Sequence, residues 1–137
     1  TYRALVLSNL VAIHQKTGIG RLSAYCGAVS AGAAAGAGIA YLCGGGYEEV
    51  IHTVVNALAI VSGMVCDGAK ASCAAKIASS VDAGILGYNM YLRGQQFYAG
   101  DGIVTKGVEA TIQNIGRLGK DGMKETTEEL IKMMISD

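Results

Sequence analysis

The chain has 137 residues, of which 51% are hydrophobic, and its formal net charge at pH 7 is zero. This length fits one domain with a core of its own, and the neutral balance argues against a general electrostatic attraction to nucleic acid. Because proline usually breaks or kinks helices, its complete absence favours long, uninterrupted helices.

The apolar pattern predicts an all-α fold, a compact bundle of about six helices that includes one buried helix rich in glycine and alanine. No strand pattern competes with it. The buried helix is the second, since no charged residue occurs from Leu22 to Tyr47. Thr126 and Glu129 match a capping box at the start of the last helix. The expected helices cover residues 2–16, 22–43, 47–62, 71–93, 103–118 and 127–135.

The uncharged stretch also permits a membrane hairpin, because small residues recur at Ala28, Gly32 and Gly36 as in packed membrane helices. A spanning helix, however, needs strongly apolar side chains over about 20 residues. Few large aliphatic side chains lie between Ser23 and Cys43, so a buried helix without membrane contact is favoured.

The beginning of the chain bears on its origin and location. Thr1 stands where a start methionine would be, and the helical pattern begins at once, which predicts that residues 1–137 are the C-terminal part of a longer protein. No secretory signal is visible. Four cysteines without a dense cysteine framework indicate reduced thiols and a cytoplasmic location.

Three cysteines have settings that favour a site for a soft metal. Cys66 opens a connection between helices, and Cys73 is expected in the first turn of the next helix, where the helix dipole stabilises a thiolate. Cys26 precedes a glycine. Cys43 fits the ordinary alternative, a buried hydrophobic cysteine. Paired Cys-x-x-Cys spacing is absent, so spacing alone does not name the metal.

Four segments resemble the C-terminal half of the iron–sulfur-dependent L-serine dehydratase alpha-chain superfamily, and most closely its L-cysteine desulfidase branch. They are residues 17–27 (TGIGRLSAYCG), 66–73 (CDGAKASC), 78–82 (ASSVD) and 109–116 (EATIQNIG).

The resemblance implies a [4Fe–4S] cluster held by Cys26, Cys66 and Cys73, with one iron open as a Lewis acid. It implies a lyase that eliminates sulfide or water from L-cysteine or L-serine, giving pyruvate and ammonia. Family members are several times longer, so a missing N-terminal part is expected to contribute to the substrate site, and the identity of the base stays open.

Other polar residues are weaker candidates. Lys16 and Arg21 could bind the substrate carboxylate, or be ordinary surface cations. Asp67 and Lys70 could form hydrogen bonds around the cluster, or be a local ion pair.

Asp82 lies in an apolar helix and is expected to pair with Lys76 or Arg93. His14 and His52 are read as partly exposed structural residues rather than bases. The competing interpretation of the whole chain is a non-catalytic helical interaction module whose cysteines are structural, and a homo-oligomer is possible in either case.

Overall fold

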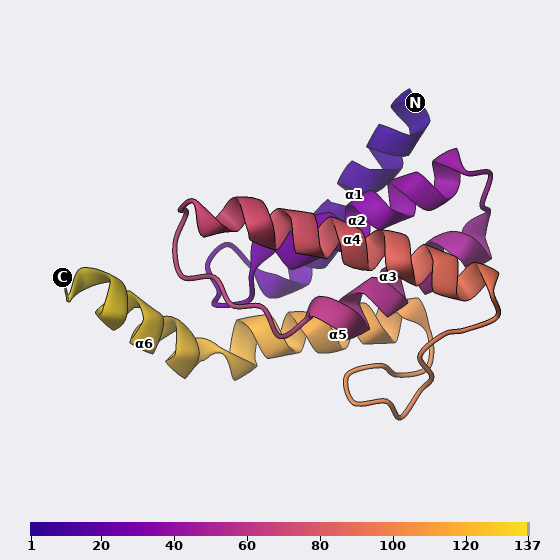
Figure 1. Ribbon diagram of the computed structural model, residues 1–137. Coiled ribbons are helices and arrows are strands. Elements are labelled where there is room, and N and C mark those ends of the chain that lie inside the picture. Colours follow the sequence, from indigo (N-terminus) through magenta and orange to yellow (C-terminus); the bar gives the residue numbers. More distant parts are fainter. Residues whose placement is uncertain (137) are drawn as a thin grey trace.

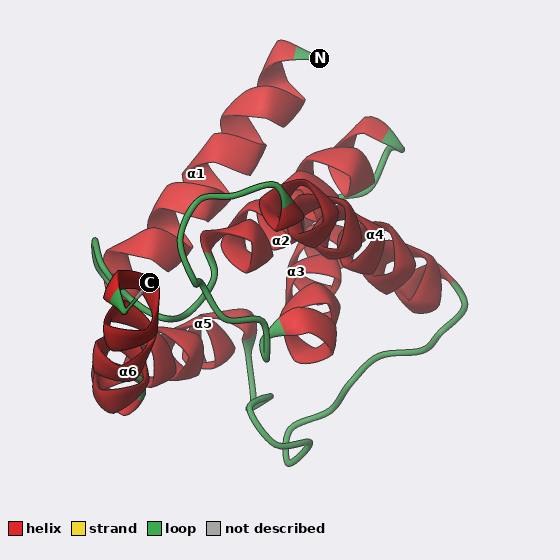
Figure 2. Ribbon diagram, turned by 60° about the vertical axis from the view of Figure 1, so that its left-hand side comes forward, coloured by secondary structure: helices red, strands yellow, loops and turns green. Residues whose placement is uncertain are grey.

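The computed structural model describes residues 1–136, and helices dominate it (Figures 1 and 2). Within that range only one isolated antiparallel bridge, Tyr25 to Val65, interrupts the helical architecture, and no strand forms. The prediction of an all-α bundle of six helices is confirmed. The elements are α1 (Tyr2–Ile19), α2 (Gly27–Leu42), α3 (Tyr47–Val61), α4 (Ser72–Leu92), α5 (Val108–Arg117), the π-helix η1 (Leu118–Gly122) and α6 (Lys124–Ile135).

The glycine- and alanine-rich helix α2 is the centre of the fold, as predicted. Nine of its 16 residues are buried, and α1, α3 and α4 all pack against it. Its lack of charge has a direct physical reason, because a charged side chain surrounded by three helices would need a buried partner.

Helices α2 and α4 pack almost backbone to backbone. A Cβ built on Gly36 would lie 2.8 Å from the Cα of Gly84, and one built on Gly32 would overlap the backbone of Ser80. The paired positions increase together along both helices, so α2 and α4 run parallel. Parallel helices begin at the same end of the bundle, and this register brings the start of α4 beside the start of α2.

Several helix boundaries differ from the prediction. Helix α1 continues through Gly18 because this glycine packs closely against Gly116 of α5. Helix α2 begins at Gly27 rather than at residue 22, since the residues before Cys26 are held in an extended connection. Helix α5 begins five residues later than expected, because Gly107 has a φ of +94° that a helix does not allow.

The predicted capping box at Thr126 and Glu129 is wrong. Helix α6 begins at Lys124, so Thr126 already lies inside it. The next residue, Thr127, uses its hydroxyl to accept a hydrogen bond from the backbone N–H of Ala24 at 3.0 Å. The hydroxyl of Thr127 therefore makes a tertiary contact from within α6.

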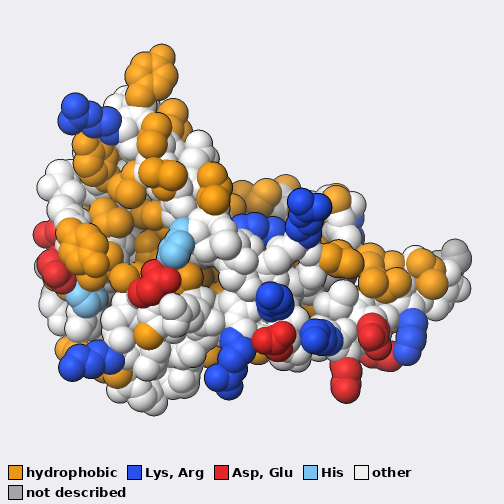
Figure 3. Space-filling view, turned by 180° about the vertical axis from the view of Figure 1, so that it is seen from behind, with side chains coloured by type: hydrophobic (Ala, Val, Ile, Leu, Met, Phe, Trp, Pro, Cys, Tyr) orange, Lys and Arg blue, Asp and Glu red, His pale blue; other side chains and the backbone are white. Residues whose placement is uncertain are grey.

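Apolar side chains gather on part of the outer surface. Figure 3 shows them over α1 and along one side of α6, with charged side chains on the other side of α6. In α1, the residues Leu5, Leu10 and Ile13 are more than half exposed. Among residues 1–136, none of the helices combines the length and hydropathy needed to cross a bilayer.

Candidate metal centre at the common end of α2 and α4

Cys26 and Cys66 lie on two adjacent antiparallel segments. The N–H of Cys26 donates to the carbonyl of Met64 at 3.2 Å, and the N–H of Cys66 donates to the carbonyl of Ala24 at 2.6 Å. Cys26 is the N-cap residue of α2 and is only 6% exposed. Figure 1 shows the connections that precede α2 and α4 at the same end of the bundle, beside α6.

Cys73 reaches the same end from α4. It lies in the first turn of that helix, and its Sγ is 3.5 Å from the carbonyl oxygen of Gly68. Gly68 has a φ of +95°, a conformation that side chains disfavour, and this lets the loop turn back toward the helix. The parallel register of α2 and α4 thus places at the same end of the bundle two cysteines that are 47 positions apart in the sequence.

Asp67 is the centre of an ion-pair network beside these cysteines. Its carboxylate accepts hydrogen bonds from Lys70 and, at 2.7 Å, from Lys76. The bond from Lys70, followed by that from Lys76, holds the pKa of Asp67 well below its usual range. The local pair of Asp67 and Lys70 was one of the two predicted readings, and it forms. The prediction that Asp82 pairs with Lys76 or Arg93 is wrong: neither pair forms among the described residues, and Asp82 is exposed to solvent, so it needs no buried partner.

The sequence analysis named Lys76 only as a possible partner of Asp82 and missed its place in this site. Its Nζ donates to the carbonyl of Val65 at 2.9 Å as well as to Asp67. The bond to Asp67 raises the pKa of Lys76, and the nearby sulfurs of Cys26 and Cys73 add to that rise. A signal existed in the sequence, because positions 73 and 76 are three apart and share one face of a helix.

A buried hydroxyl without a partner lies next to Cys26. Tyr25 is 1% exposed, and its hydroxyl has no hydrogen-bond partner among the described residues. Burial, with a contribution from Cys26, raises the pKa of Tyr25 well above its usual value. A buried O–H that lacks an acceptor is costly, so this position suits a further acceptor such as a sulfur or oxygen of a bound group.

Helix α6 covers part of the loop of residues 63–70, the cysteine loop, which contains Cys66. A small cavity of about 120 Å³ lies between them, lined by Cys66 and Gly68 on one side and by Leu130, Ile131 and Met134 on the other. Gly68 lies so close to α6 that a Cβ there would be 3.0 Å from the Sδ of Met134.

Lys16 and Arg21 lie together but apart from the cysteines. Both line a hollow of about 300 Å³ at the end of α1, and none of the cysteines lines it. Both side chains are exposed. The structure therefore joins the two predicted carboxylate-binding residues to each other and does not connect them to the three thiols.

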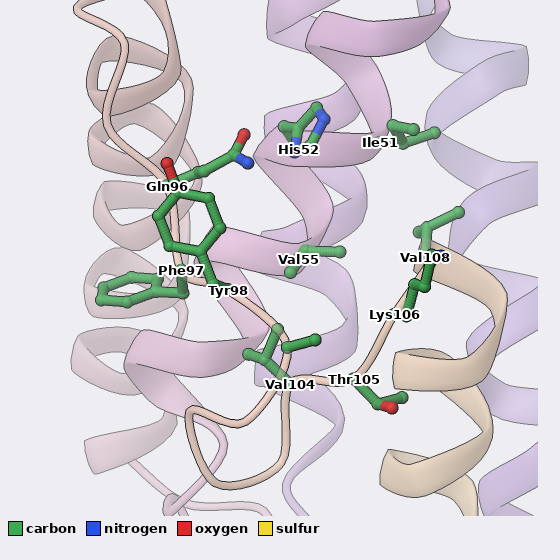
Figure 4. Close-up of a pocket in the computed structure, with 12 residues that line it drawn as sticks. Ile51, His52, Val55, Gln96, Phe97, Tyr98, Val104, Thr105, Lys106 and Val108 are labelled. Carbon is green, nitrogen blue, oxygen red and sulfur yellow. The ribbon is translucent and has the colours of Figure 1, made fainter.

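The two histidines belong to other surfaces. His14 pairs with Glu109 at 2.7 Å, and His52 stacks on Tyr91 with ring centroids 4.4 Å apart. Figure 4 shows His52 beside a hollow of about 340 Å³ between α3 and the loop that contains Phe97 and Tyr98. These contacts agree with the structural role predicted for both.

The chemistry of the donors fits an iron–sulfur cluster, while their spacing does not fit a single ion. Three of the free cysteines, Cys26, Cys66 and Cys73, belong to segments at the same end of the bundle, with Cys26 at the N-cap of α2 and Cys73 in the first turn of α4. Yet no three His, Cys, Asp or Glu side chains among residues 1–136 are placed to hold one metal ion. A four-iron cluster is wider than one ion, so it tolerates more widely separated thiolates.

Comparison with known proteins agrees with the resemblance seen in the sequence. The family model described as "Serine dehydratase alpha chain" matches residues 1–132. A UPF0597 protein of Desulfitobacterium hafniense is 70% identical over 98% of this chain, and one of Lachnoclostridium phytofermentans is 58% identical over 98%.

A third relative, a UPF0597 protein of Treponema denticola, is 55% identical over 98% of the chain. The chain spans about a third of the length of these curated relatives, 31% or 32% in each case. No solved structure matches.

Proposed function

Since this chain belongs to the serine dehydratase alpha-chain family, we propose that it is the cysteine-bearing part of a lyase. The proposed reaction removes sulfide from L-cysteine, or water from L-serine, and gives pyruvate and ammonia. The observation that carries the proposal is the gathering of Cys26 and Cys73 at the common end of α2 and α4, with Cys66 on the adjoining segment.

In this proposal Cys26, Cys66 and Cys73 hold a [4Fe–4S] cluster. Cys43 takes no part in it, and the prediction that Cys43 is a buried hydrophobic cysteine is wrong, because it is exposed at the C-terminal end of α2. When bound, a cluster with three protein ligands supplies an open iron that acts as a Lewis acid toward the leaving group. The chain's own contribution is to fix the thiolates. The tight contact between α2 and α4 sets the spacing of Cys26 and Cys73. The hydrogen bond from the N–H of Cys66 to the carbonyl of Ala24 sets the position of Cys66.

The rest of the substrate site is proposed to lie in the part of the protein outside this chain, since the relatives are about three times as long. Lys16 and Arg21 are the candidates here for binding the substrate carboxylate, as exposed cations with no competing ion pair among the described residues. Asp67 and Lys70 would stabilise the cysteine loop. Reduced thiols make the cytoplasm the expected compartment.

The direct test is the iron and sulfide content of the protein, purified without oxygen at the length its gene encodes. We expect four irons per chain in the wild type, in keeping with one four-iron cluster. The single variants Cys26→Ala, Cys66→Ala and Cys73→Ala should each lose most of that iron. Cys43→Ala is the matched control and should retain it. Iron content that is unchanged in all three variants would refute the ligand assignment.

The second candidate is a helical interaction module with structural cysteines. It is favoured by one observation, that no group of described side chains is placed to hold a single metal ion. This candidate predicts that the anaerobic protein contains no iron and that all three cysteine variants lower stability only as core substitutions do. The same preparation therefore distinguishes the two functions.

A further inference from the structure

One lysine contacts the chain on both sides of Cys66. From α4, the Nζ of Lys76 donates to the carbonyl of Val65 at 2.9 Å and to the carboxylate of Asp67 at 2.7 Å. These acceptors belong to the residues immediately before and after the cysteine. Because an ammonium group has three N–H donors, it can serve both acceptors at once.

The loop needs such a contact, because it has little regular structure of its own. Apart from the single bridge between Tyr25 and Val65, residues 63–70 have no helix or strand to fix them. Holding each of these residues in one conformation costs conformational entropy, which contacts from the rest of the protein must offset. A contact that starts on α4 ties the loop to the helix that carries Cys73.

The contact is better protected from solvent than an ordinary surface ion pair. The Lys76 side chain is 19% exposed, whereas that of Lys70, which binds the other carboxylate oxygen of Asp67, is 49% exposed. Lys70 also belongs to the loop itself, so it cannot tie the loop to a helix. Lys76 is therefore the lysine of this network that can position the loop relative to α4.

We propose that Lys76 is a positioning residue that holds the Cys66 backbone in the place from which its thiol joins Cys26 and Cys73. The proposal rests on the proposed cluster function for its purpose. Its physical content, that Lys76 orders residues 65–70, holds in the protein without a cluster. The two claims can therefore be tested separately.

The first experiment measures amide hydrogen exchange in cluster-free protein. Lys76→Met should speed exchange across residues 65–70 by about tenfold, as expected when a local opening becomes easier. Lys70→Met removes only a contact to Asp67 and should have a smaller effect. Lys132→Met is the matched control, because Lys132 forms an exposed pair with Glu129 and does not line the cavity between α6 and the loop, so it should leave the loop unchanged.

Exchange in α2 and α4 reports whether the variant is folded, and it should stay at the wild-type level. If Lys76→Met does not fold, Asp67→Asn takes its place, since it removes the charge pair and leaves the bond to Val65. Asp67→Asn should then speed loop exchange in a folded protein. If the variant that folds shows amide exchange at the wild-type rate across residues 65–70, the proposal is overturned.

The second experiment measures iron per chain and the rate at which a chelator removes it. If the wild type holds iron, Lys76→Met should lose it several times faster, and Lys76→Arg should recover part of the difference. If the wild type holds no iron while the loop still loosens in Lys76→Met, the cluster function fails and the positioning role stands. If a folded Lys76→Met variant lost iron at the wild-type rate, Lys76 would have no role in holding the cluster, and that part of the proposal would be overturned.

Discussion

Helices α2 and α6 both border the cysteine loop, but they are held in place in opposite ways. Nine residues of α2 are buried, whereas none of residues 124–135 in α6 is. Helix α2 has almost no large side chains and is fixed by backbone contact with α4. Helix α6 has a clear apolar side, of which Ile131 and Met134 are still partly exposed.

The difference shows that amphipathic pattern and burial are separate properties. Small residues allow helices to approach until their backbones touch, and dense packing then gives a rigid support for Cys26. Helix α6 contacts the cysteine loop through a few side chains, and the hydroxyl of Thr127 contacts Ala24 on the segment before α2. The bundle therefore combines a rigid scaffold beneath the thiols with a loosely attached cover over Cys66, and each prediction below tests one part of that contrast.

The largest effect is expected where α2 meets α4. Gly84→Val would place a Cβ 2.8 Å from the carbonyl oxygen of Gly32 and 2.9 Å from the Cα of Gly36. Backbone cannot move aside cheaply, so we expect a loss of about 3 kcal/mol in the free energy of unfolding. Thermal unfolding followed by circular dichroism measures it.

The matched control is Gly63→Ala. Gly63 is exposed, does not have a positive φ, and a Cβ there meets nothing within 4 Å. The free energy of unfolding of the Gly63→Ala variant should differ from that of the wild type by less than about 1 kcal/mol. If the two variants unfolded at the same temperature, the close approach of α2 and α4 would not be what stabilises the bundle.

The second effect concerns the hydroxyl that attaches α6. In Thr127→Val the buried N–H of Ala24 loses its acceptor, which costs about 1–2 kcal/mol for an unsatisfied buried donor. Exchange of the amides in α6 should rise together with that of Ala24. Thr126→Val is the control, because Thr126 is exposed on the neighbouring position of the same helix. Equal effects of the two substitutions would show that the hydroxyl does not anchor α6.

The sequence predicted helix α2 more accurately than it predicted helix α6. The lack of charge in residues 22–47 was enough to predict a buried helix, because burial of an unpaired charge is so costly. The end of α1, the start of α5 and the start of α6 were missed for a common reason. Each depends on a tertiary contact or a backbone angle, such as the φ of Gly107, that a local pattern does not contain.

For the candidate site, the sequence predicted the types of residue better than it predicted which of these residues contact one another. The local pair of Asp67 and Lys70 was foreseen as an alternative, since both lie in the short segment between Cys66 and Cys73, and it forms. The partner of Lys76 was not, because the turn at Gly68 reverses the chain before α4 begins. That Cys26 and Cys73 lie at the same end of the bundle follows from the parallel register of two helices, which no spacing along one chain reveals.

A third prediction uses pH to separate the loop from the scaffold. The pKa of Asp67 is lowered in the folded protein, so its contribution to stability is present above its unfolded pKa, near 4, and is lost as the pH falls through its folded value. Helix α2 has no acidic or basic side chain. Acid should therefore loosen residues 65–70 before it affects α2.

Hydrogen exchange corrected for the intrinsic pH dependence measures this order. In Asp67→Asn the loop should be looser at neutral pH and should lose the acid dependence. If acid loosened α2 and the loop together in the wild type, the two regions would unfold as one cooperative unit and the contrast would fail.

The smallest effect is expected from the cover itself. Met134 lines the small cavity over Cys66, and it is about half exposed, so Met134→Ala should cost only about 0.5 kcal/mol. The loss of its side chain should nevertheless open a path to the thiol, and labelling of Cys66 by iodoacetamide in cluster-free protein should become about threefold faster.

Met133→Ala is the matched control, since Met133 is the more exposed neighbour and does not line the cavity. Faster labelling with Met134→Ala alone would mean that α6 limits access to Cys66 through one side chain. Equal labelling in both variants and the wild type would mean that the loop controls access, and α6 would then be a neighbour of the site rather than its cover.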